Sequence, residues 1–136
     1  MVDKYYTPTI EEFHVGFECE ILNGYGEWSH IPVEYSHFAL GEIKDLKDWR
    51  VKHLDKEDIE SLGFTRDLER GIRLHTIVAY KDIYELEYDA LSKKVTIKTK
   101  NMIRDGSGNH QGYIIFFRGT IKNKSELKRI LKQLEI

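Results

Sequence analysis

The sequence predicts a single α+β domain over residues 1–136, built on a twisted, mostly antiparallel sheet of about five or six strands. Two observations predict this fold class. Most apolar segments are short and alternate with polar residues at a period of two, which is typical of half-buried strands. Only two segments have the capping residues and spacing typical of helices, a short central one and an amphipathic one at the C-terminus. We expect the C-terminal helix to pack on one face of the sheet.

Composition limits where the protein works. With 136 residues, 40% of them apolar, the chain has room for one core. The lone Cys19 cannot form an internal disulfide, which fits a reducing compartment. Residues 1–12 contain no apolar run of the kind found in signal peptides, and the longest apolar stretch, Tyr113–Phe117, is far too short to span a bilayer. We therefore expect a cytoplasmic protein that does not enter a membrane.

The N-terminal third predicts two strands. Phe13, Phe17, Cys19 and Ile21 alternate with polar residues and predict one strand, which ends at a glycine-rich turn over residues 23–26. A second extended piece over residues 31–35 contains Pro32, which cannot donate a ladder hydrogen bond and so predicts an edge position. Residues 38–54 are ambiguous, with partly helical spacing followed by a short strand near Val51.

The segment Asp55–Leu62 predicts a short helix with defined ends. Asp55 is placed to cap it and Asp58 lies three residues later, where a carboxylate can complete a capping box. Gly63 supplies the residue that favours a left-handed backbone after a helix, and Phe64 is placed to fold back onto Ile59.

The C-terminal half predicts strands over residues 74–80, 83–88, 93–100 and 113–121 and a final helix after Asn123. Residues 113–117 are apolar on both faces, which predicts a central strand. We expect one shared core, formed by Phe13, Phe17, Tyr113, Ile115, Phe117, Leu127, Ile130 and Leu134.

Charge is divided unevenly along the chain. Residues 1–67 carry 15 acids and 7 bases, a net of −8, whereas residues 68–136 carry 14 bases and 8 acids, a net of +6. Residues 93–136 alone carry 11 bases and 3 acids. Two interpretations stay open: the two halves attract each other within the fold, or the basic half binds an anion.

The candidate binding site lies in the basic half. Arginines can grip a phosphate bidentately, glycine N–H groups can add to the charge, and an aromatic ring can contact a base. The candidate ligand-binding residues are Lys98, Lys100, Arg104, Gly106, Gly108, His110, Tyr113 and Arg118. The alternative interpretation of residues 105–112 is a plain hairpin loop, in which glycine serves turn geometry.

Other chemistry finds little support in the sequence. The histidines His14, His30, His37, His53, His75 and His110 form no metal-binding or catalytic motif, and Cys19 is in phase with core residues. The carboxylate pairs Glu18/Glu20 and Glu85/Glu87 are typical of solvated strand faces. We expect no cofactor, no metal and no catalytic residue, and a slightly acidic chain fits a small anion better than a long nucleic acid.

Three segments carry a resemblance to known sequences: Lys4–Glu18 (KYYTPTIEEFHVGFE), Leu54–Phe64 (LDKEDIESLGF) and Gly119–Leu134 (GTIKNKSELKRILKQL). They resemble small uncharacterised proteins of bacteriophages and mobile elements of gut Bacteroidetes. The resemblance covers about a third of the chain and brings no catalytic motif with it.

A phage context implies a function class. Small phage proteins without catalytic motifs often bind and neutralise something in the host. The resemblance therefore implies a non-enzymatic host-defence antagonist that sequesters a nucleotide immune signal, such as a cyclic nucleotide, or binds a host defence protein. The alternatives are a structural or virion-accessory protein and a replication-associated nucleic-acid-binding protein. A homodimer that covers a sheet edge is a further expectation.

Overall fold

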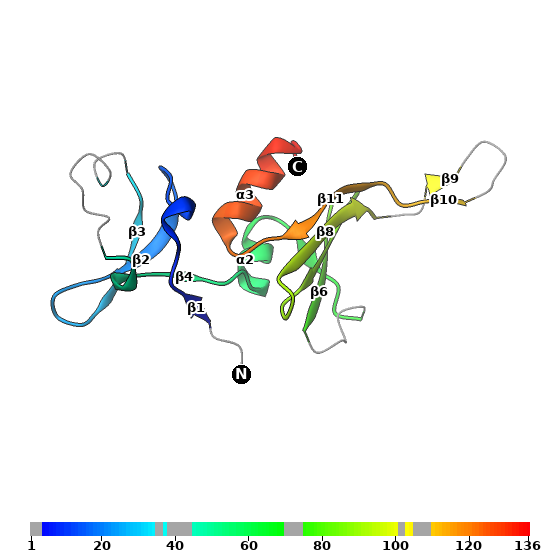
Figure 1. Ribbon diagram of the computed structural model, residues 1–136. Coiled ribbons are helices and arrows are strands. Elements are labelled where there is room, and N and C mark those ends of the chain that lie inside the picture. Colours follow the sequence, from blue (N-terminus) through cyan, green and yellow to red (C-terminus); the bar gives the residue numbers. More distant parts are fainter. Residues whose placement is uncertain (1–3, 35–36, 38–44, 70–74, 101–102, 105–109) are drawn as a thin grey trace. The chain divides into compact units, whose positions relative to one another are not determined.

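The computed structural model describes residues 4–34, 37, 45–69, 75–100, 103–104 and 110–136 (Figure 1). The protein is an α+β protein, as the sequence predicts, with antiparallel strands and a C-terminal helix. Its contacts divide the chain into two compact units. Unit 1 comprises residues 1–53 and 123–125, and unit 2 comprises residues 54–122 and 126–136. The strands are thus shared between two larger sheets, whereas the sequence predicts one; the expectation of a single domain stays a prediction.

Unit 1 is built on a four-stranded antiparallel sheet in the order β1-β4-β2-β3. Its elements are β1 (Tyr5–Tyr6), the 3-10 turn η1 (Ile10–Glu12), β2 (Glu18–Leu22), β3 (Trp28–Pro32), the 3-10 turn η2 (Leu46–Asp48) and β4 (Trp49–Lys52). Pro32 lies on the edge strand β3, and Val51 lies in β4, both as predicted. The part of residues 38–54 before Asp45 lies outside the described residues.

The predicted strand over residues 13–21 is only half present, because a turn replaces its first part. Gly16 has φ +92°, a conformation that glycine adopts without strain, and its N–H donates to the carbonyl of Val33 at 2.7 Å. Val15 is consequently 61% exposed, while Phe13 and Phe17 still reach the core of unit 1. That core also contains Cys19, Val33, Trp49 and Val51.

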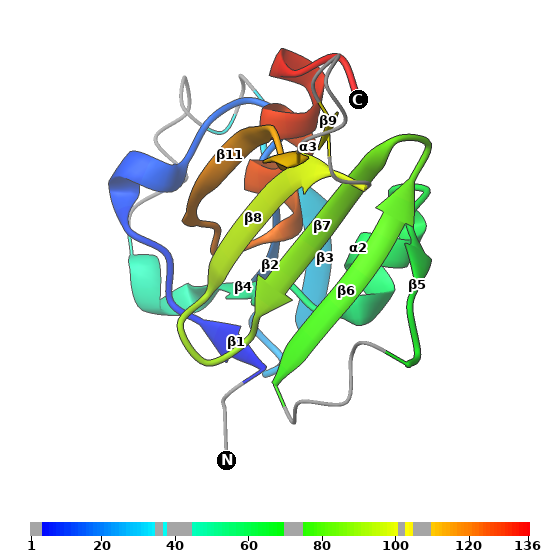
Figure 2. The same cartoon turned by 90° about the vertical axis from the view of Figure 1, so that its right-hand side faces the viewer.

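Unit 2 is built on a five-stranded antiparallel sheet in the order β11-β8-β7-β6-β5 (Figure 2). Its strands are β5 (Thr65–Arg66), β6 (Thr76–Lys81), β7 (Tyr84–Asp89), β8 (Lys94–Thr99) and β11 (Ile115–Thr120). The helices α2 (Lys56–Ser61) and α3 (Lys124–Gln133) lie behind this sheet in Figure 2, and their apolar residues join its core. A separate two-stranded ladder pairs β9 (Ile103–Arg104) with β10 (His110–Gly112).

Helix α2 has the ends that its sequence predicts. The Asp58 N–H donates to Asp55 Oδ1 at 2.9 Å, and the Asp55 N–H donates to Asp58 Oδ2 at 3.3 Å, which completes the capping box. Gly63 follows with φ +95°. Leu54, Ile59 and Phe64 are all buried in the core of unit 2, so the helix is fixed at both ends.

The core of unit 2 follows the predicted alternation of β7 and β8. Leu86 pairs with Ile97 and Tyr88 with Val95, and all four side chains are fully buried. The apolar side of α3 contributes Leu127 and Leu131, which are buried in this core, and Ile130 and Leu134, which pack against it. None of the described helices is long and apolar enough to cross a bilayer.

The prediction of a central strand over residues 113–121 is wrong. β11 pairs with β8 alone among the described strands, and its burial is correspondingly low. Tyr113, Ile114, Ile115 and Phe116 are 37–49% exposed, whereas Phe117 packs partly against the core. The predicted shared core is therefore also wrong: Phe13 and Phe17 belong to the core of unit 1, Leu127 to that of unit 2, and Tyr113 and Ile115 to neither.

Candidate functional site

The structure places six of the eight predicted ligand-binding residues in unit 2. Lys98 lies in β8 and Lys100 directly after it, while Tyr113 precedes β11 and Arg118 lies within it. Arg104 and His110 are paired in the ladder of β9 and β10, where only the backbone is described. Gly106 and Gly108 lie outside the described residues.

Strand register brings part of this set together on one face of the five-stranded sheet. Residues paired across antiparallel strands point to the same side. Lys98 pairs with Glu85, which pairs with Tyr80, and Arg118 pairs with Thr96, which pairs with Glu87. We call this side, which is opposite to the core of unit 2, the polar face; it is formed by Tyr80, Glu85, Glu87, Thr96, Lys98, Lys100 and Arg118.

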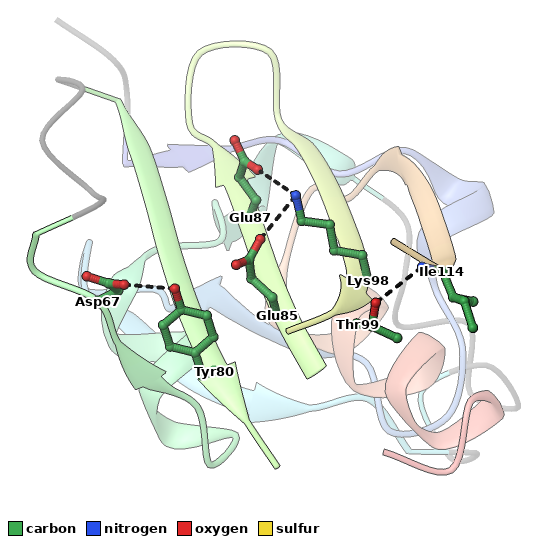
Figure 3. A network of polar contacts seen from close by, with 7 residues as sticks. All are labelled: Asp67, Tyr80, Glu85, Glu87, Lys98, Thr99 and Ile114. Carbon is green, nitrogen blue, oxygen red and sulfur yellow. Dashed lines mark hydrogen bonds and ion pairs between the residues drawn. The ribbon is translucent and has the colours of Figure 1, made fainter. Parts of the chain in front are cut away.

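An ion pair occupies the middle of the polar face, as Figure 3 shows. The Lys98 Nζ lies 3.2 Å from Glu85 Oε2 and 4.0 Å from Glu87 Oε2. The Glu85 side chain is 1% exposed and that of Lys98 18%. Lys98 is therefore neutralised by its own sheet, since a buried carboxylate requires a cation nearby.

Each lysine of the polar face also contacts an aromatic ring. The Lys98 Nζ lies 4.5 Å from the centre of the Tyr113 ring, and the Lys100 Nζ lies 4.9 Å from that of Tyr80. The Tyr80 hydroxyl donates to Asp67 Oδ2 at 2.8 Å (Figure 3). The two rings are thus held in fixed positions on the same side of the sheet.

Two hydrogen bonds just before β11 fix the backbone next to Tyr113. The Ile114 N–H donates to the hydroxyl of Thr99 at 3.2 Å, and the Thr99 N–H donates to the carbonyl of Ile114 at 2.9 Å. Tyr113 itself is 42% exposed, and Arg118 is exposed as well. Within the described part of the chain, Lys100 and Arg118 have no carboxylate within ion-pair distance, so their charges face solvent.

Unit 1 contains a pocket that the sequence analysis missed. Its lining residues come from β1, β3, η2, β4 and their flanks: Tyr5, Tyr6, Thr7, Trp28, Lys47, Trp49, Arg50 and His53. We call it the arginine pocket. Arg50, one of the lining residues, pairs across the sheet with Glu20, which lies 30 positions away in the sequence. Aromatic enrichment around Tyr5, Tyr6 and Trp28 is the only sequence signal that points to it.

Three side chains with reactive chemistry, Cys19, His14 and His53, are engaged in packing or in local contacts. Burial raises the pKa of the Cys19 thiol to about 12, with a smaller contribution from Glu20, so the thiolate is scarce at neutral pH. His14 Nδ1 lies 2.9 Å from the carbonyl of Glu12, and His53 stacks on Tyr6 with 4.7 Å between ring centres. No group of three or more metal-ligating side chains gathers among the residues that the structure describes.

No protein-family model matches this sequence, and neither a curated protein nor a solved structure matches the chain. The similarity to phage proteins is therefore still an expectation from the sequence, and function has to be argued from the side chains themselves.

Proposed function

We propose that this protein is a non-enzymatic binding protein whose polar face takes an anionic ligand of nucleotide type. The observation that supports the proposal most directly is the placement of Lys100, Arg118 and the exposed ring of Tyr113 on one side of a rigid sheet. Cations for phosphate and a ring for a base are the two elements that nucleotide binding needs.

The charges available to a ligand are fewer than the sequence indicates. Lys98 is bound by Glu85 and holds the Tyr113 ring in place, so it acts as a positioning residue. Lys100 and Arg118 then carry the binding of anionic groups. Arg118 lies opposite Thr96, and Lys100 follows Thr96 by four residues along the direction of β8. The two cations are therefore about 13 Å apart in that direction. This span suits a ligand with two separated phosphates better than a single phosphate.

The resemblance to phage proteins extends the proposal to a biological role. A phage protein that holds a cyclic nucleotide would lower the concentration of a host immune signal without converting it. Such sequestration needs affinity and abundance but no catalytic group.

The proposal is tested by a panel of cyclic dinucleotides, cyclic trinucleotides and ADP-ribose derivatives, scanned by thermal shift and calorimetry. A ligand at 100 times its dissociation constant raises the free energy of unfolding by about 2.7 kcal/mol. Lys100→Ala combined with Arg118→Ala should abolish this shift. The matched control is Arg129→Ala with Lys132→Ala, which removes two exposed cations from α3 and should preserve the shift. A panel without any stabilising anion would reject the proposal.

A second candidate function, binding of a host protein, is favoured by the exposed apolar residues of β11. It predicts that Ile115→Lys, and not the pair Lys100→Ala and Arg118→Ala, abolishes inhibition of host defence in cells. The opposite pattern would favour the nucleotide ligand.

A further inference from the structure

The arginine pocket of unit 1 has the size and the lining of a ligand site. Its volume is about 410 Å³, within the range of about 300–1,000 Å³ that is usual for small-molecule pockets. Five of its eight lining residues are aromatic or histidine side chains: Tyr5, Tyr6, Trp28, Trp49 and His53. Trp28 and Trp49 are the two tryptophans of the chain.

The Arg50 guanidinium in the lining of this pocket is held between two aromatic rings and a carboxylate. Its guanidinium carbon lies 3.8 Å from the centre of the Tyr5 ring and 4.3 Å from that of the Trp28 ring. Its Nε donates to Glu20 Oε2 at 2.7 Å. A flexible side chain is thereby held in one position, so a ligand that binds it need not immobilise it.

The contacts of Arg50 with Tyr5, Trp28 and Glu20 leave only some of its N–H groups available to a ligand. The two rings lie against the guanidinium, and Glu20 takes the Nε–H. The remaining N–H groups of a guanidinium lie in its plane, on the two terminal nitrogens. Planar, two-pronged donors of this kind match the oxygen atoms of a carboxylate or a phosphate.

The charge of the lining has the opposite sign to its surroundings. Residues 1–53, the main part of unit 1, carry 10 acids and 5 bases, a net of −5, yet the eight lining residues include Lys47 and Arg50 and no carboxylate. Lys47 does lie 3.5 Å from Asp45, but both side chains are more than half exposed, so this pair is weak. Apart from its Nε–H, which is paired with Glu20, the Arg50 guanidinium therefore meets a lining of rings and a second cation.

We infer that the arginine pocket binds a small oxyanion, a phosphate monoester or a carboxylate, attached to a flat apolar body. The oxyanion lies against the in-plane donors of Arg50 with Lys47 nearby, and the flat body lies against the aromatic lining. This inference does not rest on the proposed nucleotide site, because every residue that it uses belongs to unit 1.

Tryptophan fluorescence reports on this pocket directly, because both tryptophans line it. The probes are phenyl phosphate and benzoate, with benzyl alcohol as a neutral molecule of similar size. We expect a saturable change with at least one anion and binding of the alcohol weaker by about tenfold or more. The tighter of the two anions identifies the head group. Equal binding of the alcohol and the anions would overturn the inference, as would the absence of any saturable change.

Two variants separate the role of Arg50 from folding. Arg50→Lys keeps the charge and loses the planar fork, and should weaken the tighter anion by about tenfold. Lys47→Met removes an exposed side chain, leaves the fold intact and should weaken the same anion by a few fold. Arg129→Ala, which removes an exposed cation from α3, is the matched control and should bind as the parent does. Parental affinity in both Lys47→Met and Arg50→Lys would refute the site, and the thermal-shift panel on Arg50→Lys shows separately whether the polar face binds nucleotides.

Discussion

Removing the cation from the buried ion pair Lys98–Glu85 should be strongly destabilising. The Nζ–Oε2 distance of 3.2 Å corresponds to a Coulomb attraction of about 5 kcal/mol at an effective dielectric constant of about 20. Glu85 is 0% exposed, so Lys98→Met leaves a carboxylate that water cannot reach. Breaking such a pair from one side costs about 3–5 kcal/mol. We therefore expect Lys98→Met to lower the free energy of unfolding by about 3–5 kcal/mol.

The assay is urea denaturation followed by far-UV circular dichroism, with the midpoint and the slope fitted separately. The double variant Lys98→Met with Glu85→Gln also removes the buried negative charge and should recover most of the loss. Lys94→Met is the matched control, because it removes an exposed lysine from the same strand and should change stability by less than about 0.5 kcal/mol.

A loss below about 1 kcal/mol in Lys98→Met would refute this account of the pair. Lys98 would then behave as a surface cation, since exposed ion pairs contribute about 0–1 kcal/mol. Lys98 would also become available to a ligand, and the assignment of nucleotide binding to Lys100 and Arg118 alone would fail with it.

The remaining predictions concern buried groups and the exposed edge. The Tyr88 hydroxyl is buried without a hydrogen-bond partner among the described residues, so Tyr88→Phe should raise the unfolding free energy by up to about 1 kcal/mol; a loss of that size in urea denaturation would contradict this. Burial raises the pKa of Cys19 from 9.0 to about 12, so native protein at pH 8 should react with iodoacetamide about a thousandfold more slowly than protein in urea; equal rates would show an accessible thiolate. Burial also raises the pKa of Tyr88 from 10.0 to about 12, so the unfolded chain loses the protons of Cys19 and Tyr88 at lower pH than the native protein does. The stabilisation that these two groups contribute should be fully present below pH 9 and fall between pH 9 and 12. An unchanged urea midpoint at pH 11 would exclude this. Phe116→Lys, at 37% exposure, should preserve the melting temperature and reduce aggregation measured by light scattering, and a large loss of melting temperature would show that the ring is buried in solution.

Local signals account for the parts of the fold that the sequence predicts well. Helix α2 is specified within ten residues by Asp55, Asp58 and Gly63, and all three adopt the predicted roles. Strand β11 is different, because apolar residues on both faces indicate burial but cannot say which strand becomes the neighbour. The order of strands depends on pairing between distant segments, and here it leaves Ile115 and Phe116 at an edge.

Both candidate sites contain the same arrangement of side chains, and the way it forms explains which site could be predicted from the sequence. In each, a carboxylate pairs with a cation directly across two antiparallel strands, and the cation lies against an aromatic ring. For Glu85 and Lys98 the strands are joined by a short hairpin, so the short gap between the predicted strands 83–88 and 93–100 already implies the register that opposes them. For Glu20 and Arg50 the paired strands β2 and β4 are neighbours in the sheet, but β3 and η2 come between them along the chain. No local turn therefore sets their register. The site of Arg50 could therefore be located only after the strands were paired.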